Sequence, residues 1–472
     1  MNQSNPVTFC LSSAGTKTSF VLRRRGCKVI TAQKLQKMLR FNPSQLLVIA
    51  FAAGIILGAV LLKLPAATHG SIRWLDALFI SASAMTVTGL ATVDPGSTFT
   101  TFGQTIIAVL IQLGGLGIMS FAILTYMVLG KKIGIKERLV MQHALNQTSL
   151  GGVVNLVKYL FLFSIMIEFI AMIFLSFRWV PEFGWSKGLF YSFFHAISAF
   201  NNAGFALWPD NIIRYVNDPL VNIVISSLFI IGGIGFTVLL DIWKKRKFSK
   251  LSLHTRIMLV GTLVINVFAM MFIFFVEYSN PETLGNLSSG GKLLASYFQA
   301  VSPRTAGFNT LDMASLDEAT LFLMIILMFI GGGSASTAGG IKLTTAIIIV
   351  LATITFLRGK EDITIGRRSI HSRYILKALA IAMVSLMFVL TAIFILTISE
   401  KASFIEILFE TVSAFGTVGL SMGITGSLSD LGKEVIIVIM FIGKVGPLTL
   451  LFTLTKPQKQ KIKYPNEDIL TG

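Results

Sequence analysis

The chain has 472 residues, of which 54% are hydrophobic and only 13% charged, and its mean hydropathy is +0.77. A soluble core cannot hide so much apolar surface, so the composition indicates a membrane protein and excludes an ordinary soluble domain. The formal net charge is +18, but most basic residues lie in short segments between apolar runs, which favours membrane topology over nucleic-acid binding as their explanation.

Residues 1–44 are polar and basic, and they lack the apolar core and cleavage site of a signal peptide, so we expect a cytoplasmic leader. Cys10 and Cys27 both precede the first apolar run, so neither can cross-link the membrane core. The five histidines are scattered, with no metal-ligand spacing. The sequence therefore predicts neither a bound cofactor nor a metalloenzyme.

Apolar runs long enough to cross about 30 Å of hydrocarbon, which takes roughly 20 helical residues, occur eight times. They lie near 45–64, 104–129, 155–176, 219–243, 256–276, 320–357, 374–398 and 433–454. Between them stand four stretches of only about a dozen apolar residues, which are too short to cross and predict re-entrant half-helices. These stretches lie near 75–86, 188–201, 292–303 and 403–416.

The basic residues support this layout. Segments expected in the cytoplasm carry 29 of the 40 Lys and Arg residues, and segments expected outside carry nine. This asymmetry predicts a multi-pass protein of the plasma membrane with both termini in the cytoplasm. It also places the ends of the half-helices toward the outer face.

The half-helices end in a motif that recurs four times without a gap. Its copies are FISASAMTVTGL, FHAISAFNNAGF, YFQAVSPRTAGF and FETVSAFGTVGL, with their glycines at Gly89, Gly204, Gly307 and Gly419, separated by 115, 103 and 112 residues. The repeat predicts an all-α membrane fold of four helix, half-helix, strand and helix units around one central pore. The expected units are 45–130, 155–243, 256–357 and 374–454, followed by a cytoplasmic tail at 455–472.

The strand around each glycine can turn its carbonyl groups onto a shared axis. Half-helices that end there direct their partially negative ends toward the membrane centre, which favours a cation. A ring of carbonyl oxygens can replace the hydration shell of a potassium ion, and glycine permits the backbone angles that this requires. The predicted filter residues are Thr86, Val87, Thr88, Gly89, Asn201, Asn202, Ala203, Gly204, Thr305, Ala306, Gly307, Thr417, Val418 and Gly419. Each strand has one glycine where potassium-channel filters have two, so we expect looser discrimination against sodium.

A second repeated feature lies in the second apolar run of each unit: GGLG at 114–117, GGIG at 232–235, GGGS at 331–334 and GKVG at 443–446. In the first two copies, we expect close helix packing through small residues. The third copy opens a run too rich in Gly and Ser for a helix in lipid, and unwound backbone at this depth must line a cavity. This predicted gating loop comprises Gly331, Gly332, Gly333, Ser334, Ala335, Ser336, Thr337, Ala338, Gly339 and Gly340.

Several phrases of the sequence closely resemble the Trk/Ktr/HKT superfamily of potassium transporters, most of all the bacterial KtrB and KtrD membrane subunits. They are TVTGLATVD, HAISAFNNAGFALWPDN, SYFQAVSPRTAGFNTLD, MFIGGGSASTAGGIKLTT and ETVSAFGTVGLSMG. The resemblance covers about residues 35–472. It implies potassium uptake, often stimulated by sodium, by a homodimer with one pore per subunit. It also implies a cytoplasmic regulatory ring of the RCK/KTN type, similar to KtrA or KtrC, that binds ATP or ADP and, in some bacteria, cyclic di-AMP.

Five polar side chains need separate interpretations. Lys444 stands alone in an apolar run, so it should face the interior of the bundle, and the resemblance matches it to a basic residue that faces the pore. We expect it to close the pore together with the gating loop. Arg304 and Asp312 flank the third glycine, either as a rim pair or as two solvated groups. His195 is interpreted as a packed, hydrogen-bonding residue rather than a ligand. Lys342 follows the gating loop, but GGIKLTT lacks the order of a phosphate-binding loop.

Two other classes of function compete with a potassium pore. A carrier with alternating access for another cation or small solute would also use broken helices near the midplane. It would not need four filter strands. An intramembrane enzyme would need a nucleophile and a base at helical spacing, which the sequence lacks.

Overall fold

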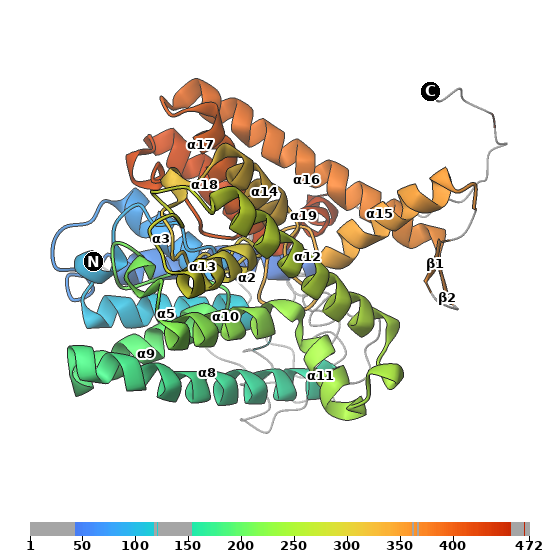
Figure 1. Cartoon of the computed structure of the whole chain (residues 1–472). Helices are drawn as coiled ribbons and strands as arrows, with labels where there is room; N and C mark the ends of the chain where they lie inside the picture. The colour runs from blue at the N-terminus through green and yellow to red at the C-terminus, as the bar shows by residue number, and fades with distance from the viewer. Residues whose placement is uncertain are drawn as a thin grey trace, which may run out of the picture. The chain divides into compact units, whose positions relative to one another are not determined.

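The structure of the chain is a computed structural model that describes residues 43–117, 120, 153–360, 363–365, 368–454 and 467. The predicted leader and tail therefore lie almost entirely outside the described residues. Most of the described chain is helical (Figure 1).

Each predicted unit begins with one long helix. These helices are α2 (Pro43–Leu62), α8 (Val153–Phe183), α12 (Leu253–Glu277) and α16 (Ser372–Ser399). All four are long and apolar enough to cross a membrane. The helix α8 continues beyond the predicted end at 176, and Arg178 and Glu182 pair with each other in its last turns at 2.8 Å.

A shorter helix lies at each of the four predicted half-helices. They are α3 (Trp74–Thr86), α9 (Trp185–Phe200), α13 (Ser289–Val301) and α17 (Phe404–Gly416). Each packs against the long helix that precedes it. Capping side chains fix the starts of two of them, since Ser288 caps α13 and Ser403 forms a capping box with Glu406 at the start of α17.

In every unit the helix of the second apolar run ends within that run, which was predicted only for the third unit, at the gating loop. The helices there are α5 (Thr101–Leu116), α10 (Pro219–Ile234) and α11 (Phe236–Lys245), α14 (Glu318–Phe329) and α15 (Leu343–Leu357), and α18 (Asp430–Val445) and α19 (Pro447–Leu454). Three of the ends fall at Gly117, Gly235 and Gly446, whose φ angles of 84°, 111° and 92° cannot continue a right-handed helix. The axes of α10 and α11 differ by 93°.

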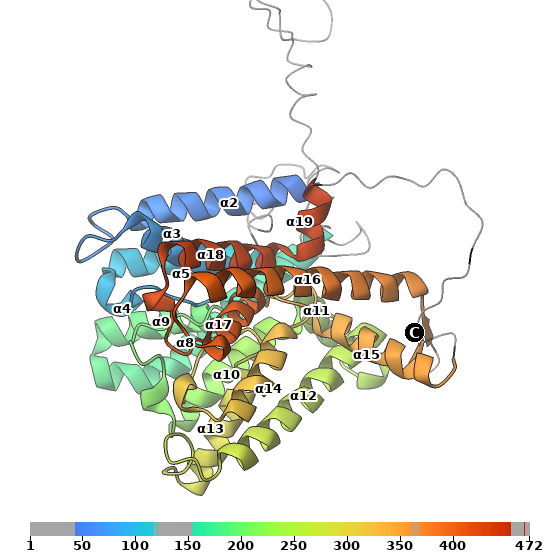
Figure 2. The ribbon, with the colours of Figure 1, turned by 90° about the horizontal axis from the view of Figure 1, so that it is seen from above.

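The remaining described elements are short. They are α4 (Pro95–Thr98), the 3₁₀ helices η1 (Ile213–Tyr215), η2 (Phe248–Lys250), η3 (Met313–Ser315) and η4 (Thr425–Ser427), and the strands β1 (Ile363–Ile365) and β2 (Arg368–Ile370). The two strands form an antiparallel hairpin in which Ile363 pairs with Ile370. It connects α15 to α16, and these two helices lie side by side in Figures 1 and 2.

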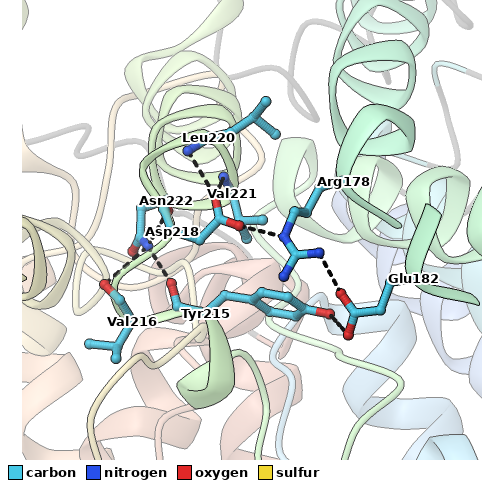
Figure 3. Close-up of polar contacts among 8 residues, drawn as sticks. All are labelled: Arg178, Glu182, Tyr215, Val216, Asp218, Leu220, Val221 and Asn222. Atoms are coloured by element: carbon cyan, nitrogen blue, oxygen red, sulfur yellow. Dashed lines mark hydrogen bonds and ion pairs between the residues drawn. The ribbon is translucent and has the colours of Figure 1, made fainter. Parts of the chain in front are cut away.

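Polar groups fix the second unit where α8 ends and α10 begins (Figure 3). Asp218 caps α10 by accepting from the amides of its first turn and also pairs with Arg178 at 2.7 Å. Tyr215 donates to Glu182 at 3.1 Å, while Asn222 donates to the carbonyl oxygen of Tyr215 at 2.7 Å. Burial and the nearby Glu182 carboxylate raise the pKa of the Tyr215 phenol, so it remains a donor over the physiological pH range.

The apolar core surrounds the four repeated motifs. The residue after each motif glycine is buried, with at most 1% of its surface exposed: Leu90, Phe205, Phe308 and Leu420. Burying such a side chain contributes about 1.5–3 kcal/mol. The core therefore holds one end of every glycine segment in place.

Candidate functional site

The four glycine strands (86–89, 201–204, 304–307 and 416–419) follow directly from the C-terminal ends of α3, α9, α13 and α17. The residue two positions before each glycine adopts a left-handed conformation, although none is glycine. These residues are Val87, Asn202, Thr305 and Thr417, with φ angles of 51°, 58°, 71° and 50°. The glycines also have positive φ, between 67° and 100°. Alternation of the sign of φ turns successive carbonyl groups toward the same side of a strand, as a cation-binding carbonyl ring requires.

The glycine strands contact one another in a closed cycle. A β-carbon built on Gly89 would lie 3.1 Å from the Cα of Gly204, and one on Gly204 would lie 2.8 Å from the Cα of Gly307. One on Gly307 would overlap the carbonyl oxygen of Val418, and one on Gly419 would lie 3.0 Å from the Cα of Gly89. A β-carbon on Gly89 would also overlap the carbonyl oxygen of Ala203, and one on Gly419 that of Thr88. Real side chains essentially never approach backbone so closely, so these four positions need glycine for space as well as for φ.

Serine hydroxyls hold the strands from behind in two ways. Ser83 and Ser413 accept from the amides of Gly89 and Gly419, at 3.0 and 3.1 Å. Ser198 donates to the carbonyl oxygen of Phe205 at 2.8 Å, and Ser302 donates to that of Phe308. The sequence analysis missed these roles. A serine six positions before the glycine in three of the four motif copies was the available signal.

The expected close packing of the first two GG pairs is confirmed. A β-carbon on Gly114 would overlap the carbonyl oxygen of Met85, and one on Gly232 would overlap that of Phe200. Gly443 stands in the same relation to Phe415. In three units, therefore, the second helix fits against the last carbonyls of the half-helix, just beneath the glycine strand.

The glycine-serine loop (331–340) separates α14 from α15 and contains no helix, as predicted. None of its residues is exposed. Backbone hydrogen bonds attach it to the break between α10 and α11: the Gly333 amide donates to Gly233 at 2.7 Å, and the Phe236 amide donates to Ala335 at 2.8 Å. The loop is therefore an ordered buried segment.

Two lysines bond to adjacent carbonyl oxygens of this loop. Lys444 donates to Thr337 at 2.7 Å, and Lys342 donates to Ala338 at 2.6 Å. The prediction that Lys444 faces the interior is confirmed. The sequence around Lys342 indicated no role for that lysine, because GGIKLTT only partly resembles a phosphate-binding loop. The amino groups of both lysines therefore lie at the loop backbone.

The proposed rim pair of Arg304 and Asp312 is wrong. Arg304 is buried and donates to the Asn266 side chain of α12 at 3.2 Å, whereas Asp312 caps η3 through the Ala314 amide. Among the described residues, no carboxylate pairs with Arg304. The alternative of two solvated groups fails for Arg304 as well, because only 9% of its surface is exposed.

His195 is a packed residue, as expected. Its side chain is fully buried and stacks on Trp208, with ring centroids 4.4 Å apart. Its Nδ1 lies 2.8 Å from the carbonyl oxygen of Tyr191, while Nε2 accepts from the Leu207 amide at 3.4 Å. The described residues contain no group of His, Cys, Asp and Glu that could hold a metal ion.

A buried carboxylate lies behind the second glycine strand, and the sequence analysis missed it. Glu168 of α8 accepts from Ser164 at 2.7 Å, from Gln112 at 3.1 Å and from Asn201 at 3.4 Å. Glu168 and Gln112 also line an otherwise apolar cavity of about 370 Å³ between α5, α8 and α9. A lone glutamate in the apolar run 155–176 was the available signal.

Comparison with known proteins identifies the family. The family model described as TrkH, cation transport protein, matches residues 26–464. The chain belongs to the TrkH family of cation transport proteins. Membership confirms the resemblance noted in the sequence, and with the long apolar helices it makes this TrkH-family chain a multi-pass membrane protein.

Individual relatives match along almost their whole length. The chain is 60% identical over 439 residues to the Ktr system potassium uptake protein B of Bacillus subtilis, covering 93% of this chain and 99% of that protein. It is 43% identical to the Ktr system potassium uptake protein B of Vibrio alginolyticus (91% and 94% covered) and 38% identical to the potassium/sodium uptake protein NtpJ of Enterococcus hirae (94% and 100% covered). The crystal structure of the potassium transporter TrkH from Vibrio parahaemolyticus has the same fold, with a TM-score of 0.71 at 19% identity and coverage of 89% and 86%.

Proposed function

We propose that this TrkH-family chain is the potassium-translocating membrane subunit of a Ktr-type uptake system in the bacterial plasma membrane. The observation that carries the proposal is the closed cycle of four glycine strands, in which alternating φ signs can direct carbonyl oxygens inward. The 60% identity to a protein named for potassium uptake favours potassium as the ion. We take the full set of predicted residues in the glycine strands as the selectivity filter.

In this proposal, potassium enters from outside and exchanges its water for carbonyl oxygens of the filter. The C-terminal ends of four half-helices add a partially negative field that favours a cation. Inward movement follows the membrane potential. The excess of basic residues in the expected cytoplasmic segments supports an orientation with both termini inside and the filter toward the outer face. Sodium acts as a second ion, and the name of the Enterococcus hirae relative supports this.

The gate in this proposal is the glycine-serine loop together with Lys444. Their hydrogen bond at 2.7 Å holds a positive charge beside the path of the ion. The whole subunit works as a homodimer on a cytoplasmic, nucleotide-binding ring of the RCK/KTN type. The resemblance to Ktr subunits supports the ring, and the relatives' names refer to a Ktr system of which this chain would be one part.

Rescue of a bacterium that lacks its own potassium uptake tests the proposed function. Cells carrying the wild-type chain and its regulator should grow on low potassium, and cells carrying Gly307→Ala should not. Gly423→Ala is the matched control, because Gly423 has a φ of 96° but nothing within 4 Å of an added β-carbon. Lack of rescue by a wild-type chain that reaches the membrane would refute the proposal, and equal growth of the two glycine variants would refute the filter assignment.

A further inference from the structure

The side chain of Asn202 extends from the second glycine strand to the glycine-serine loop. Its Oδ1 accepts a hydrogen bond of 2.7 Å from the hydroxyl of Thr337. Its Nδ2 donates to the hydroxyl of Thr305 at 3.4 Å, at the matching position of the third glycine strand. At most 1% of the surface of each of these three residues is exposed. The buried amide side chain of Asn202 therefore connects the second glycine strand to both the third glycine strand and the loop.

The residues in the left-handed position of the four glycine strands differ in whether their side chains can hydrogen-bond to the loop. The side chain of Val87 has no hydrogen-bonding group. The hydroxyl of Thr417 has no partner among the described residues, although its side chain closely faces Gly339 of the loop. Asparagine is among the residues that tolerate a left-handed backbone best, so Asn202 combines this backbone with a side-chain bond to the loop.

Thr337 joins this contact to Lys444. Its carbonyl oxygen accepts from Lys444 at 2.7 Å while its hydroxyl donates to Asn202 at 2.7 Å. A displacement of the loop that separates Thr337 from Asn202 leaves a buried amide oxygen without its donor, which is unfavourable. A change of conformation in the second glycine strand could give the Asn202 side chain a new donor and so offset part of this loss. The conformations of the loop and of the second glycine strand are therefore energetically linked.

We propose that the bond between Asn202 and Thr337 couples the position of the glycine-serine loop to the conformation of the second glycine strand, so that displacement of the loop changes ion preference as well as access. The proposal rests on the proposed function, because it needs the strand to select the ion and the loop to move. Asn202 is then a positioning residue for the filter and a link between gate and filter.

Ion preference measured on four variants tests the coupling. Asn202→Gly removes the side chain but keeps a residue that favours the left-handed backbone, and Thr337→Val removes the hydroxyl at similar size. Each should change the ratio of rubidium to sodium uptake into proteoliposomes by about 2–10-fold, the range of one hydrogen bond. The double variant should change the ratio no more than the larger single change, because both remove one interaction. Thr337→Ser should restore the wild-type ratio.

Val87→Gly is the matched control, since Val87 has the same backbone conformation in the first glycine strand. In a double variant of Val87→Gly and Thr337→Val, the change in the ratio of rubidium to sodium uptake should equal the product of the two single changes. An unchanged ratio of rubidium to sodium uptake in Thr337→Val would overturn the coupling. So would a double variant of Asn202→Gly and Thr337→Val whose change in this ratio equals the product of the two single changes.

Hydrogen–deuterium exchange tests the same coupling between the loop and the second glycine strand without measuring transport. Thr337→Val should speed exchange in peptides covering 201–207 and leave those covering 86–92 unchanged. Equal exchange of wild type and variant over 201–207 would also overturn the coupling. A wild-type chain that carries no rubidium but shows this exchange pattern would refute the proposed function and leave the link between loop and strand standing.

Discussion

Lys444 donates a 2.7 Å hydrogen bond to the carbonyl oxygen of Thr337, which lies 107 residues earlier in the chain. The bond joins the end of α18 to the glycine-serine loop, and its donor is a charged group at a depth where charges are expensive. Such a residue is retained for function more readily than for stability. Lys444 is therefore the clearest target for mutation.

Lys444→Met should raise potassium flux in the absence of a regulator. An ammonium group repels a potassium ion by about 4 kcal/mol at 4 Å with an effective dielectric constant near 20, so even partial relief predicts a rise of about tenfold. Ion preference should stay close to wild type, because the bond between Asn202 and Thr337 is kept. The measurement is rubidium uptake into vesicles with the purified chain. Lys444→Arg serves as the control that keeps the charge, and flux at or below wild type in Lys444→Met would contradict the gate.

Breaking the buried ion pair between Asp76 and Lys433 should destabilise the protein strongly. The pair joins α3 to α18 at 2.8 Å, and only 7% of the Lys433 side chain and 9% of the Asp76 side chain is exposed. Lys433→Met leaves a buried carboxylate without its partner, a loss of about 3–5 kcal/mol. The thermal unfolding midpoint in detergent should fall clearly.

A second ion pair between the same segments provides the control for that experiment. Arg73 and Asp430 are 2.5 Å apart, but 60% and 63% of their side chains is exposed. Arg73→Met should change the midpoint little, because exposed pairs contribute little. Equal midpoints for the Lys433 and Arg73 variants would show that burial of the first pair is unimportant.

Glu168→Ala should destabilise the second unit and disturb its glycine strand. The substitution removes the acceptor shared by Ser164, Gln112 and Asn201. The amides of Gln112 and Asn201 keep other acceptors, but the Ser164 hydroxyl loses its acceptor, and a buried donor left unpaired costs about 1–3 kcal/mol. We expect a lower unfolding midpoint together with a changed ratio of rubidium to sodium uptake. Glu318→Ala, at an exposed position in the first turn of α14, is the control. An unchanged midpoint and ratio would show that the network has no part in holding Asn201.

The apolar runs were sufficient to predict the long helices and the half-helices, and the repeated motif was sufficient to predict the position of the glycine strands. Periodicity and length carry that information, because each apolar run must match the thickness of the membrane. The length and periodicity of the apolar runs did not predict the helix breaks at Gly117, Gly235 and Gly446. A glycine pair serves equally for close helix packing and for a left-handed bend, and here neighbouring glycines do both.

The side-chain contacts of the site depended on tertiary structure. Arg304 could be placed only once α12 brought Asn266 beside it. The link from Asn202 to Thr337 joins residues 135 positions apart. No local rule of spacing predicts such a pair, whereas the identity of the glycines follows directly from the backbone that they must adopt.

Influx of potassium and sodium into proteoliposomes at a set, inside-negative potential tests the central claim most directly. We predict that both the wild-type chain and Lys444→Met carry potassium faster than sodium, with a rate that grows with the potential. Gly204→Ser should reduce this preference, and Gly423→Ser should not, because only Gly204 contacts a neighbouring glycine strand. Potassium influx no greater than in protein-free liposomes, or a preference that is the same in wild type and Gly204→Ser, would contradict the account.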